Sequence, residues 1–258
     1  MDFDTSLLSQ WLVSLLLPFF RVAAFMMTVP VFGNQLVPLR VRLLLALALS
    51  ALLMPVLPPV TGFEPLSIQA VIVIAQQILI GAGLGFFVQV FFHIFVMAGQ
   101  MIAMQMGLGF ASMIDPTNGV SVAVVSQFYV LLVTLLFLSF NGHLVALDVF
   151  VQGFYYLPLV DSTLHQSAVY TIAAAGSWML SASLLLALPA VSAILIVNFA
   201  FGVMTRAAPQ LNIFSLGFPF TLVFGIFILW MAIGGFLPQY ESISAELFRE
   251  LDKLLNMG

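Results

Sequence analysis

The sequence contains no cysteine and very little charge of either sign. Its 258 residues include six basic and ten acidic ones, so only 6% are charged, against about a quarter in an average soluble domain. So few charged groups cannot cover the surface of a folded chain of this length, which excludes a soluble fold. The absence of cysteine excludes disulfides, thiolate metal sites and cysteine catalysis.

Positive charge is scarce, with six lysines and arginines in the whole chain. They form no stripe that could follow a phosphate backbone, which excludes a nucleic-acid-binding protein. The chain opens with Asp2 and Asp4 instead of the basic residues that start a secretory signal. We therefore interpret the first apolar run, from Leu7 to Phe32, as a retained membrane helix.

The sequence consists largely of long apolar runs. Hydrophobic residues make up 63% of the chain, too many for a disordered protein, and uncharged stretches cover 43–63, 65–114, 116–147, 162–205 and 207–240. A membrane-spanning helix needs about 20 apolar residues, so the sequence predicts five to seven spans. The runs lack the alternation of β-barrel strands. The predicted fold class is an all-α membrane protein.

Helices are expected near 6–31, 41–54, 66–104, 120–140, 144–157, 167–204 and 214–237. The helix from residue 66 would be roughly 60 Å long, twice the hydrocarbon core. It must either tilt and project or break near Gly81, Gly83 and Gly85. Because small residues let helices approach closely, we assign Gly81, Gly85 and Gly99 to helix packing within an oligomer.

Several polar residues interrupt the apolar runs. At membrane depth they either bond neighbouring helices or face a water-filled path, and both interpretations stay open for Gln76, Gln77, Gln89, Gln100, Gln105 and Asn198. Arg21 lies within the first run, where a charge at a helix centre costs ~2.5–3.5 kcal/mol. We expect its long side chain to reach toward the nearer interface.

Signs of catalysis are sparse. The histidines at 93, 143 and 165 form no His-Glu-x-x-His pair, and the sequence has neither a Gly-x-Ser-x-Gly elbow nor a phosphate-binding glycine loop. Asp115, Asp148 and Asp161 all lie beside turn signals and not deep in a span. We therefore expect no enzyme, no cofactor and no metal site.

The stretch from Met97 to Gly119 is the most unusual part of the sequence. Met97, Met101 and Met104 fall on one helix face, and glycines, an Asp-Pro pair and an Asn-Gly pair then break the helix. This predicts an irregular loop with an apolar tip. At membrane depth such backbone is tolerated only inside protein or along a water cavity, where it can close a passage. The alternative is a loop that touches the outer interface.

Four groups of residues together resemble a known family. They are Arg21-x-x-Ala24 with Pro30-x-x-Gly33 and Pro38-x-Arg40-Val41-Arg42; Ala98-Gly99-Gln100-x-Ile102 with Gln105-Met106-Gly107 and Asp115-Pro116; Asn141-Gly142-His143; and Asn198-Phe199-Ala200-Phe201-Gly202-x-x-x-Arg206-x-x-Pro209-Gln210-x-Asn212-x-Phe214 with Gly217-Phe218-Pro219. In their order along nearly the whole chain, they resemble the FliR family of flagellar biosynthetic membrane proteins, called the SctT class in injectisomes.

The resemblance implies an export-gate subunit built of long tilted helical hairpins, a FliP-like part followed by a FliQ-like part. It implies an N-terminal hairpin part over 1–120, C-terminal hairpins over 120–237 and an amphipathic cytoplasmic tail over 238–258. The implied partners are FliP, FliQ, FlhB and FlhA, in a hetero-oligomer of the bacterial inner membrane and flagellar basal body. Membrane lipid and unfolded flagellar proteins in transit would be further contacts.

The resemblance also implies a plug, because a loop of this subunit closes the pore in the family. The matching position is 107–119, with plug residues Gly107, Leu108, Gly109, Phe110, Met113, Ile114, Asp115 and Pro116, and a seat formed by Met97, Met101 and Met104. Gly107, Gly109 and Gly119 would be its hinges. The alternative from another class is a polytopic small-solute transporter or channel, which would need a substrate site between alternating halves.

Two further segments are assigned to structure or partner contact. Arg206, with Pro209, Gln210 and Asn212 after it, either pairs with a partner carboxylate or exposed helix carbonyls, or reaches to the cytoplasmic interface. In the tail, an apolar stripe opposes a charged face and is formed by Ile243, Leu247, Phe248, Leu251, Leu254 and Leu255. Family context places this stripe against FlhB, and the alternative is a helix lying on lipid.

Overall fold

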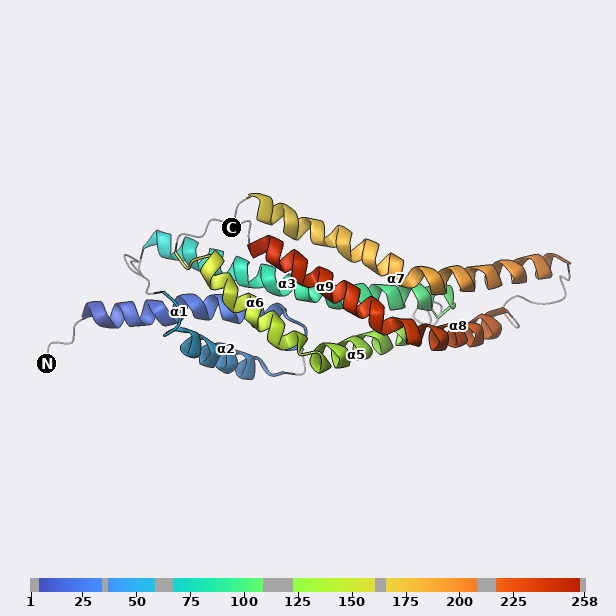
Figure 1. The fold of residues 1–258 in the computed structure, drawn as a ribbon, viewed down its shortest axis with the longest axis horizontal. Helices are drawn as coiled ribbons and strands as arrows, with labels where there is room; N and C mark the ends of the chain where they lie inside the picture. The colour runs from blue at the N-terminus through green and yellow to red at the C-terminus, as the bar shows by residue number, and fades with distance from the viewer. Residues whose placement is uncertain are drawn as a thin grey trace. The chain divides into compact units, whose positions relative to one another are not determined.

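The computed structural model describes residues 5–33, 37–58, 67–108, 123–160, 166–207 and 217–255. All regular structure in these ranges is helical (Figure 1), which confirms the predicted all-α class. The elements are α1 (Thr5–Thr28), α2 (Leu39–Leu53), α3 (Ile68–Gln105), α5 (Val124–Ser139), α6 (Gly142–Tyr156), α7 (Gln166–Ala207), α8 (Phe218–Ala232), the 3-10 turn η2 (Ile233–Gly235) and α9 (Phe236–Leu255).

The described residues hold four helical stretches long and apolar enough to cross a membrane: Trp11–Thr28, Ile68–Gln105, Ser167–Ala207 and Phe218–Leu255. A fifth arises if α5 and α6, which meet at a bend of 68°, count as one span. The predicted number of spans, five to seven, therefore agrees with the described residues only at its lower limit. The expected span near residue 41 is wrong, because α2 has 15 residues and reaches only about 22 Å of a 30 Å core.

The helix α3 runs unbroken for 38 residues, so its three neighbouring glycines do not interrupt it. A glycine inside a helix costs about 1 kcal/mol relative to alanine. Here close packing offsets that cost, because a Cβ on Gly81 would overlap the carbonyl oxygen of Arg21, and one on Gly85 would overlap the hydroxyl of Thr28. Both contacts are with α1 of the same chain.

The chain divides into two compact units. The first combines residues 1–90, 138–175 and 247–258, and the second combines 91–137 and 176–246. Each unit therefore draws on both the N-terminal and the C-terminal part of the chain. The expected succession of a FliP-like and a FliQ-like part stays a prediction.

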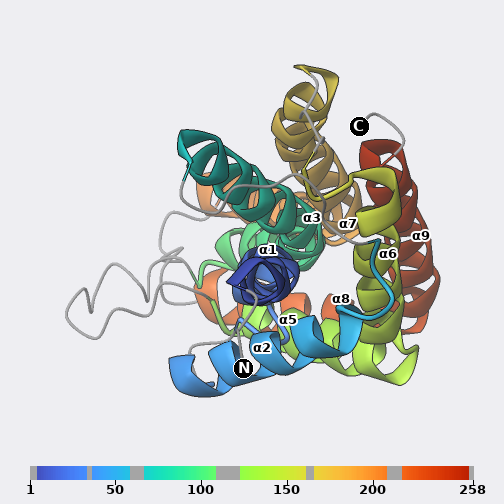
Figure 2. The ribbon, with the colours of Figure 1, turned by 90° about the vertical axis from the view of Figure 1, so that its left-hand side faces the viewer.

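In the first unit, α1 lies beside α2 and the first half of α3 (Figure 2). The face of α1 that points inward is apolar, with Leu17, Val22 and Phe25 almost fully buried. Phe25 stacks on Phe150 of α6 with ring centroids 4.3 Å apart. Such an aromatic pair adds about 0.5–1.5 kcal/mol beyond its buried area, and it holds α6 against α1.

The second unit is built on a cluster of aromatic rings. Phe91 and Phe95 of α3 lie 5.4 Å apart, and Phe95 lies 5.6 Å from Phe236 of α9. Phe137 and Tyr129 of α5 complete the cluster, at 6.0 Å from Phe91 and 5.3 Å from Phe236. These contacts fix the second half of α3 against α5 and the start of α9.

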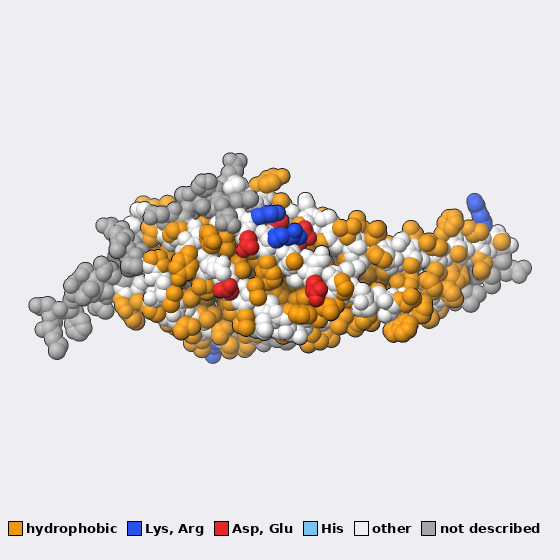
Figure 3. Space-filling view, in the orientation of Figure 1, with side chains coloured by type: hydrophobic (Ala, Val, Ile, Leu, Met, Phe, Trp, Pro, Cys, Tyr) orange, Lys and Arg blue, Asp and Glu red, His pale blue; other side chains and the backbone are white. Residues whose placement is uncertain are grey.

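Apolar side chains also dominate the outside of the molecule, and the acidic and basic groups in Figure 3 gather mainly over α9. On α7, Ile196 is 70% exposed and Phe199 74% exposed, and on α8, Trp230 is 68% exposed. Contiguous apolar patches of this kind mark contact with lipid or with other proteins. The chain is a membrane protein whose helices are only partly covered by one another.

Candidate functional site

The C-terminal end of α3 carries the start of the predicted plug. The backbone at this helix end forms a specific capping motif. Gly107 has φ +85°, its N–H donates to the carbonyl of Met104 at 3.0 Å, and the N–H of Leu108 donates to the carbonyl of Ala103 at 3.0 Å. These two bonds form a Schellman motif, in which glycine takes the left-handed position after the helix. The motif stops α3 and sets the direction in which the chain leaves it.

Two contacts with α8 hold this cap in place. A Cβ on Gly107 would lie 2.9 Å from the ring of Phe218, and one on Gly225 would lie 2.5 Å from Cγ of Met106. Met106 is only 1% exposed, so its flexible side chain fills the space that Gly225 leaves open. The cap therefore rests on α8 and favours a fixed anchor over a hinge at Gly107.

The chain returns from the segment 109–122 at Ala123, beside the same helix. The N–H of Ala123 donates to Oε1 of Gln100 at 3.1 Å, and the hydroxyl of Ser126 donates to the carbonyl of Val96 at 3.0 Å. Gly99 makes this approach possible, because a Cβ there would lie 2.6 Å from Cα of Ser126. Both ends of the segment are therefore tied to the last turns of α3.

A third helix, α7, also contacts the end of α3. Nδ2 of Asn198 on α7 donates to the carbonyl of Gln105 at 3.3 Å, one of the α3 carbonyls left without an intrahelical partner. Gln100 and Asn198 therefore bond neighbouring backbone groups, as one of the two open interpretations expected. Gly107, Met106, Gln100, Ser126 and Asn198 form what we call the loop base.

The structure places only some of the predicted gate residues. Leu108 is half-buried beside the cap, whereas Gly109, Phe110, Met113, Ile114, Asp115 and Pro116 lie outside the described residues. Of the predicted seat, Met97 and Met101 are half-buried and Met104 is 63% exposed. Sequence periodicity missed Met106, because it lies off the face shared by the other three and is placed by the helix cap.

The second polar cluster surrounds Arg21 in the first unit, and here the expectation was wrong. Arg21 does not reach toward an interface, because its side chain is fully buried. Its Nε donates to Oε1 of Gln77 at 2.6 Å, and its guanidinium donates to the carbonyls of Gly153 and Leu157 at 3.2 and 2.9 Å. The last two belong to the end of α6, where a positive charge is favourable.

Two neighbours complete the environment of Arg21. The ring of Phe154 lies 4.4 Å from the guanidinium carbon, a cation–π contact, and Nε2 of Gln77 donates to the carbonyl of Leu159 at 2.8 Å. Arg21 and Gln77 therefore join α1 and α3 to the end of α6. A signal existed in the sequence, since a buried arginine needs several acceptors and Gln77 was among the polar residues at membrane depth.

The remaining predicted residues have simpler surroundings. Arg206 is exposed in the last turn of α7, and Pro209, Gln210 and Asn212 lie outside the described residues. In the tail, α9 is helical as predicted, but its apolar stripe is largely buried against its own chain, at Leu247, Leu251, Leu254 and Leu255. That burial argues against both FlhB and lipid as the main cover of this stripe.

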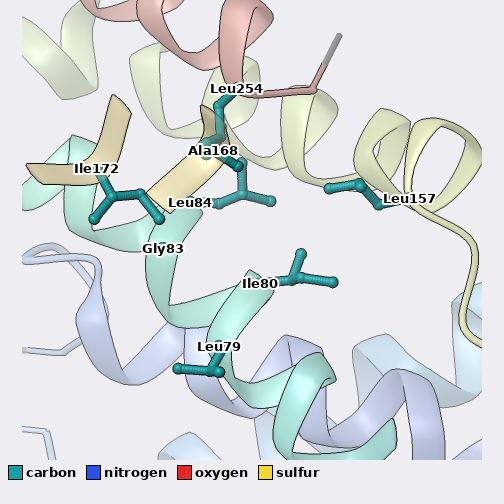
Figure 4. A pocket seen from close by; sticks show the side chains of 8 residues that line it. All are labelled: Leu79, Ile80, Gly83, Leu84, Leu157, Ala168, Ile172 and Leu254. Carbon is teal, nitrogen blue, oxygen red and sulfur yellow. The ribbon is translucent and has the colours of Figure 1, made fainter. Parts of the chain in front are cut away.

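Two observations among the described residues bear on the binding of small molecules and metals. No group of three or more histidine or acidic side chains there is placed to hold a metal ion. The cavity in Figure 4 lies in the first unit and has a volume of about 10 Å³, with Gly83, Leu84 and Ile172 in its lining. That volume is about one water molecule, and its apolar walls offer such a water no polar partner.

Long apolar helices and a partly uncovered apolar surface define this chain as a helical membrane protein. The sequence comparisons make the class specific. The model of the family "Bacterial export proteins, family 1" matches residues 12–247, so the chain belongs to that family, the FliR proteins. The resemblance in the sequence motifs is thereby confirmed.

Several relatives bear this out. The chain is 38% identical over 247 residues to the flagellar biosynthetic protein FliR of Pectobacterium carotovorum subsp. carotovorum, covering 95% of this chain and 92% of the relative. It is 37% identical to FliR of Escherichia coli K12, covering 96% and 94%, and 28% identical to FliR of Bacillus subtilis 168, covering 83% of each chain. These relatives are named as flagellar biosynthetic proteins and not as enzymes.

Proposed function

We propose that this chain is a subunit of the flagellar type III protein export gate. With FliP and FliQ it forms the pore through which unfolded flagellar proteins cross the inner membrane at the basal body, and it contacts FlhB and FlhA there. Its own contribution is a plug, the loop at 107–119, which closes the pore at rest.

The observation that carries this proposal is the loop base. Hydrogen bonds tie both Leu108 and Ala123 to the last turns of α3, so the two residues that flank 109–122 are held by the same helix. A plug needs this arrangement, because its tip must move while its ends stay in register with the pore. The apolar residues of the segment suit closure by dewetting, in which water leaves a narrow apolar passage and hydrated ions cannot follow.

The exposed face of α7 supports the proposed partners. Only 28% of its spanning stretch is buried inside the chain, against 50% for α3. At 42 residues and about 1.5 Å per residue, α7 is roughly twice as long as a bilayer core is thick. Lipid alone therefore does not cover it, and neighbouring helices of FliP and FliQ would.

Removal of the plug tests the function. A deletion of Phe110 to Ile114 should leave the complex assembled but permeable, measured as ion or small-dye entry into cells, with assembly checked by co-purification of FliP and FliQ. Replacing Phe110, Met113 and Ile114 by serine keeps the loop length and should also leak, because a polar passage stays wet. An assembled complex as tight as the wild type would refute the plug, and loss of assembly would make the loop a structural joint.

A further inference from the structure

A groove in the second unit combines an apolar wall with a carboxylate that has no partner among the described residues. Ala182, Leu185 and Leu186 of α7 form one side, and Gln239, Ser242 and Glu246 of α9 form the other. The groove has a volume of about 210 Å³, more than the roughly 150 Å³ that holds a benzene molecule. It is large enough to receive one long side chain.

Glu246 is the unusual member of this groove. It is half-buried and makes no hydrogen bond or ion pair within the described part of the chain, whereas Glu250, one turn further along, accepts a hydrogen bond from Lys253 at 2.6 Å. Removing a carboxylate from water is costly unless a cation or donors replace the water. An apolar element that covered this groove would therefore be favoured if it brought a positive charge with it.

The other wall demands apolar cover. Leu185 is 70% exposed at the rim of the groove, and its neighbours Leu184 and Leu188 are 51% and 50% exposed. Acyl chains would cover these leucines but would leave the carboxylate unpaired. A long basic side chain meets both requirements, because its methylene groups can lie along the leucines while its charged head reaches Glu246.

We propose that this groove seats an apolar helix of another gate subunit, which inserts one arginine or lysine toward Glu246. The proposal rests on the proposed function, since it assigns one contact within that assembly. Gln239 and Ser242, both exposed at the same edge, would accept the remaining hydrogen bonds of a guanidinium. Arginine is the better fit, because it is less strongly hydrated than lysine and offers five donors.

The chain offers a matched control for the charge. Glu241 lies on the same helix but outside the groove and is exposed, so its replacement introduces the same charge change without touching the groove. We would place a photoreactive residue at position 185 in the chain co-expressed with FliP and FliQ. Crosslinked peptides would then be identified by mass spectrometry in otherwise wild-type chain and in the Glu246→Arg, Glu246→Gln and Glu241→Arg backgrounds.

The expected result is a crosslink to a helix of another subunit with a lysine or arginine within one turn of the crosslinked position. Glu246→Arg should lower its yield at least tenfold and Glu246→Gln several-fold, while Glu241→Arg leaves it unchanged. Changing the identified basic residue to glutamate should restore the yield in Glu246→Arg. This rescue separates a lost charge pair from a misfolded variant.

The contrary results are distinct. Crosslinks that reach only lipid or only a second copy of this chain would overturn the proposal, and so would equal yields in Glu246→Arg and Glu241→Arg. In each of these cases the wild-type chain would still co-purify with FliP and FliQ. If the wild-type chain fails to co-purify with them, the proposed function itself fails.

Discussion

Arg21 shows how a single residue can organise a membrane protein that has almost no charge. Its side chain is fully buried and satisfied by one side-chain oxygen and two backbone carbonyls at the end of α6. A buried charge persists only with such compensation. The arrangement makes Arg21 a clamp between α1, α3 and α6, and it explains why the residue lies in the middle of an apolar helix.

Substitutions of Arg21 test how much its hydrogen bonds contribute to stability. Arg21→Met should lower the stability of the purified complex by about 3–5 kcal/mol, because it leaves Oε1 of Gln77 and the carbonyl of Leu157 buried without the Arg21 donor, while the carbonyl of Gly153 keeps only its backbone donor. Arg21→Lys should cost less but still destabilise, because one ammonium cannot reach three acceptors in the plane of a guanidinium. Thermal unfolding would measure both. Arg40→Met is the control, since Arg40 is exposed, and equal effects at the two sites would contradict the clamp.

At the scale of elements, glycines decide how closely α3 meets its neighbours. Gly99 allows the start of α5 to approach, since a Cβ there would lie 2.6 Å from Cα of Ser126. A Cβ on Gly176 in α7 would meet no other part of the described chain within 4 Å, its own helix backbone aside. The same residue type therefore has opposite consequences on two long helices, and the difference lies only in what faces it.

This contrast gives a paired prediction. Gly99→Ala should destabilise the complex by about 1–3 kcal/mol, because the backbone of Ser126 must move to make room. It should also disturb the bonds that tie Ala123 to Gln100. Gly176→Ala should be neutral or stabilising by about 0.4–1 kcal/mol, because it restricts the unfolded chain without a clash. Denaturation of the two purified variants would decide, and a loss of stability at Gly176 comparable to that at Gly99 would be the contrary outcome.

At the scale of the whole molecule, the main feature is the apolar surface of the helices. Large apolar side chains remain exposed on α7 and α8, among them Ile196, Phe199, Val223 and Trp230. Such side chains are covered by lipid or by other proteins. Because the chain belongs to the family of bacterial export proteins, we expect other subunits of the apparatus to cover part of this surface.

Partner dependence can be measured directly. The chain expressed alone should aggregate or be degraded in detergent, because its uncovered α7 face has no matching helix. The chain co-expressed with FliP and FliQ should elute as one homogeneous species in size-exclusion chromatography. The sharpest control is co-expression of the partners with the Leu185→Glu, Ile196→Glu double variant, which should behave like the chain alone. Homogeneous elution of the chain alone would contradict this prediction.

The sequence by itself determined the class and the family. Six percent charge and long apolar runs leave a helical membrane protein as the outcome, because only helices satisfy every backbone group within one apolar segment. The motifs from Arg21 to Pro219 identified the family, since they are local patterns that need no coordinates. The tail helix was also predictable, because its apolar and charged residues separate at helical spacing.

The tertiary structure decided which faces are covered and by what. Arg21 was expected at an interface and is buried, because its acceptors come from Gln77 and from residues 153 and 157, far away along the chain. The apolar stripe of α9 was expected to await a partner and is covered by its own chain. Met106 and Glu246 gained their importance only from neighbours on other helices. Hydropathy and periodicity describe one helix at a time, whereas these roles arise from contacts between helices distant in sequence.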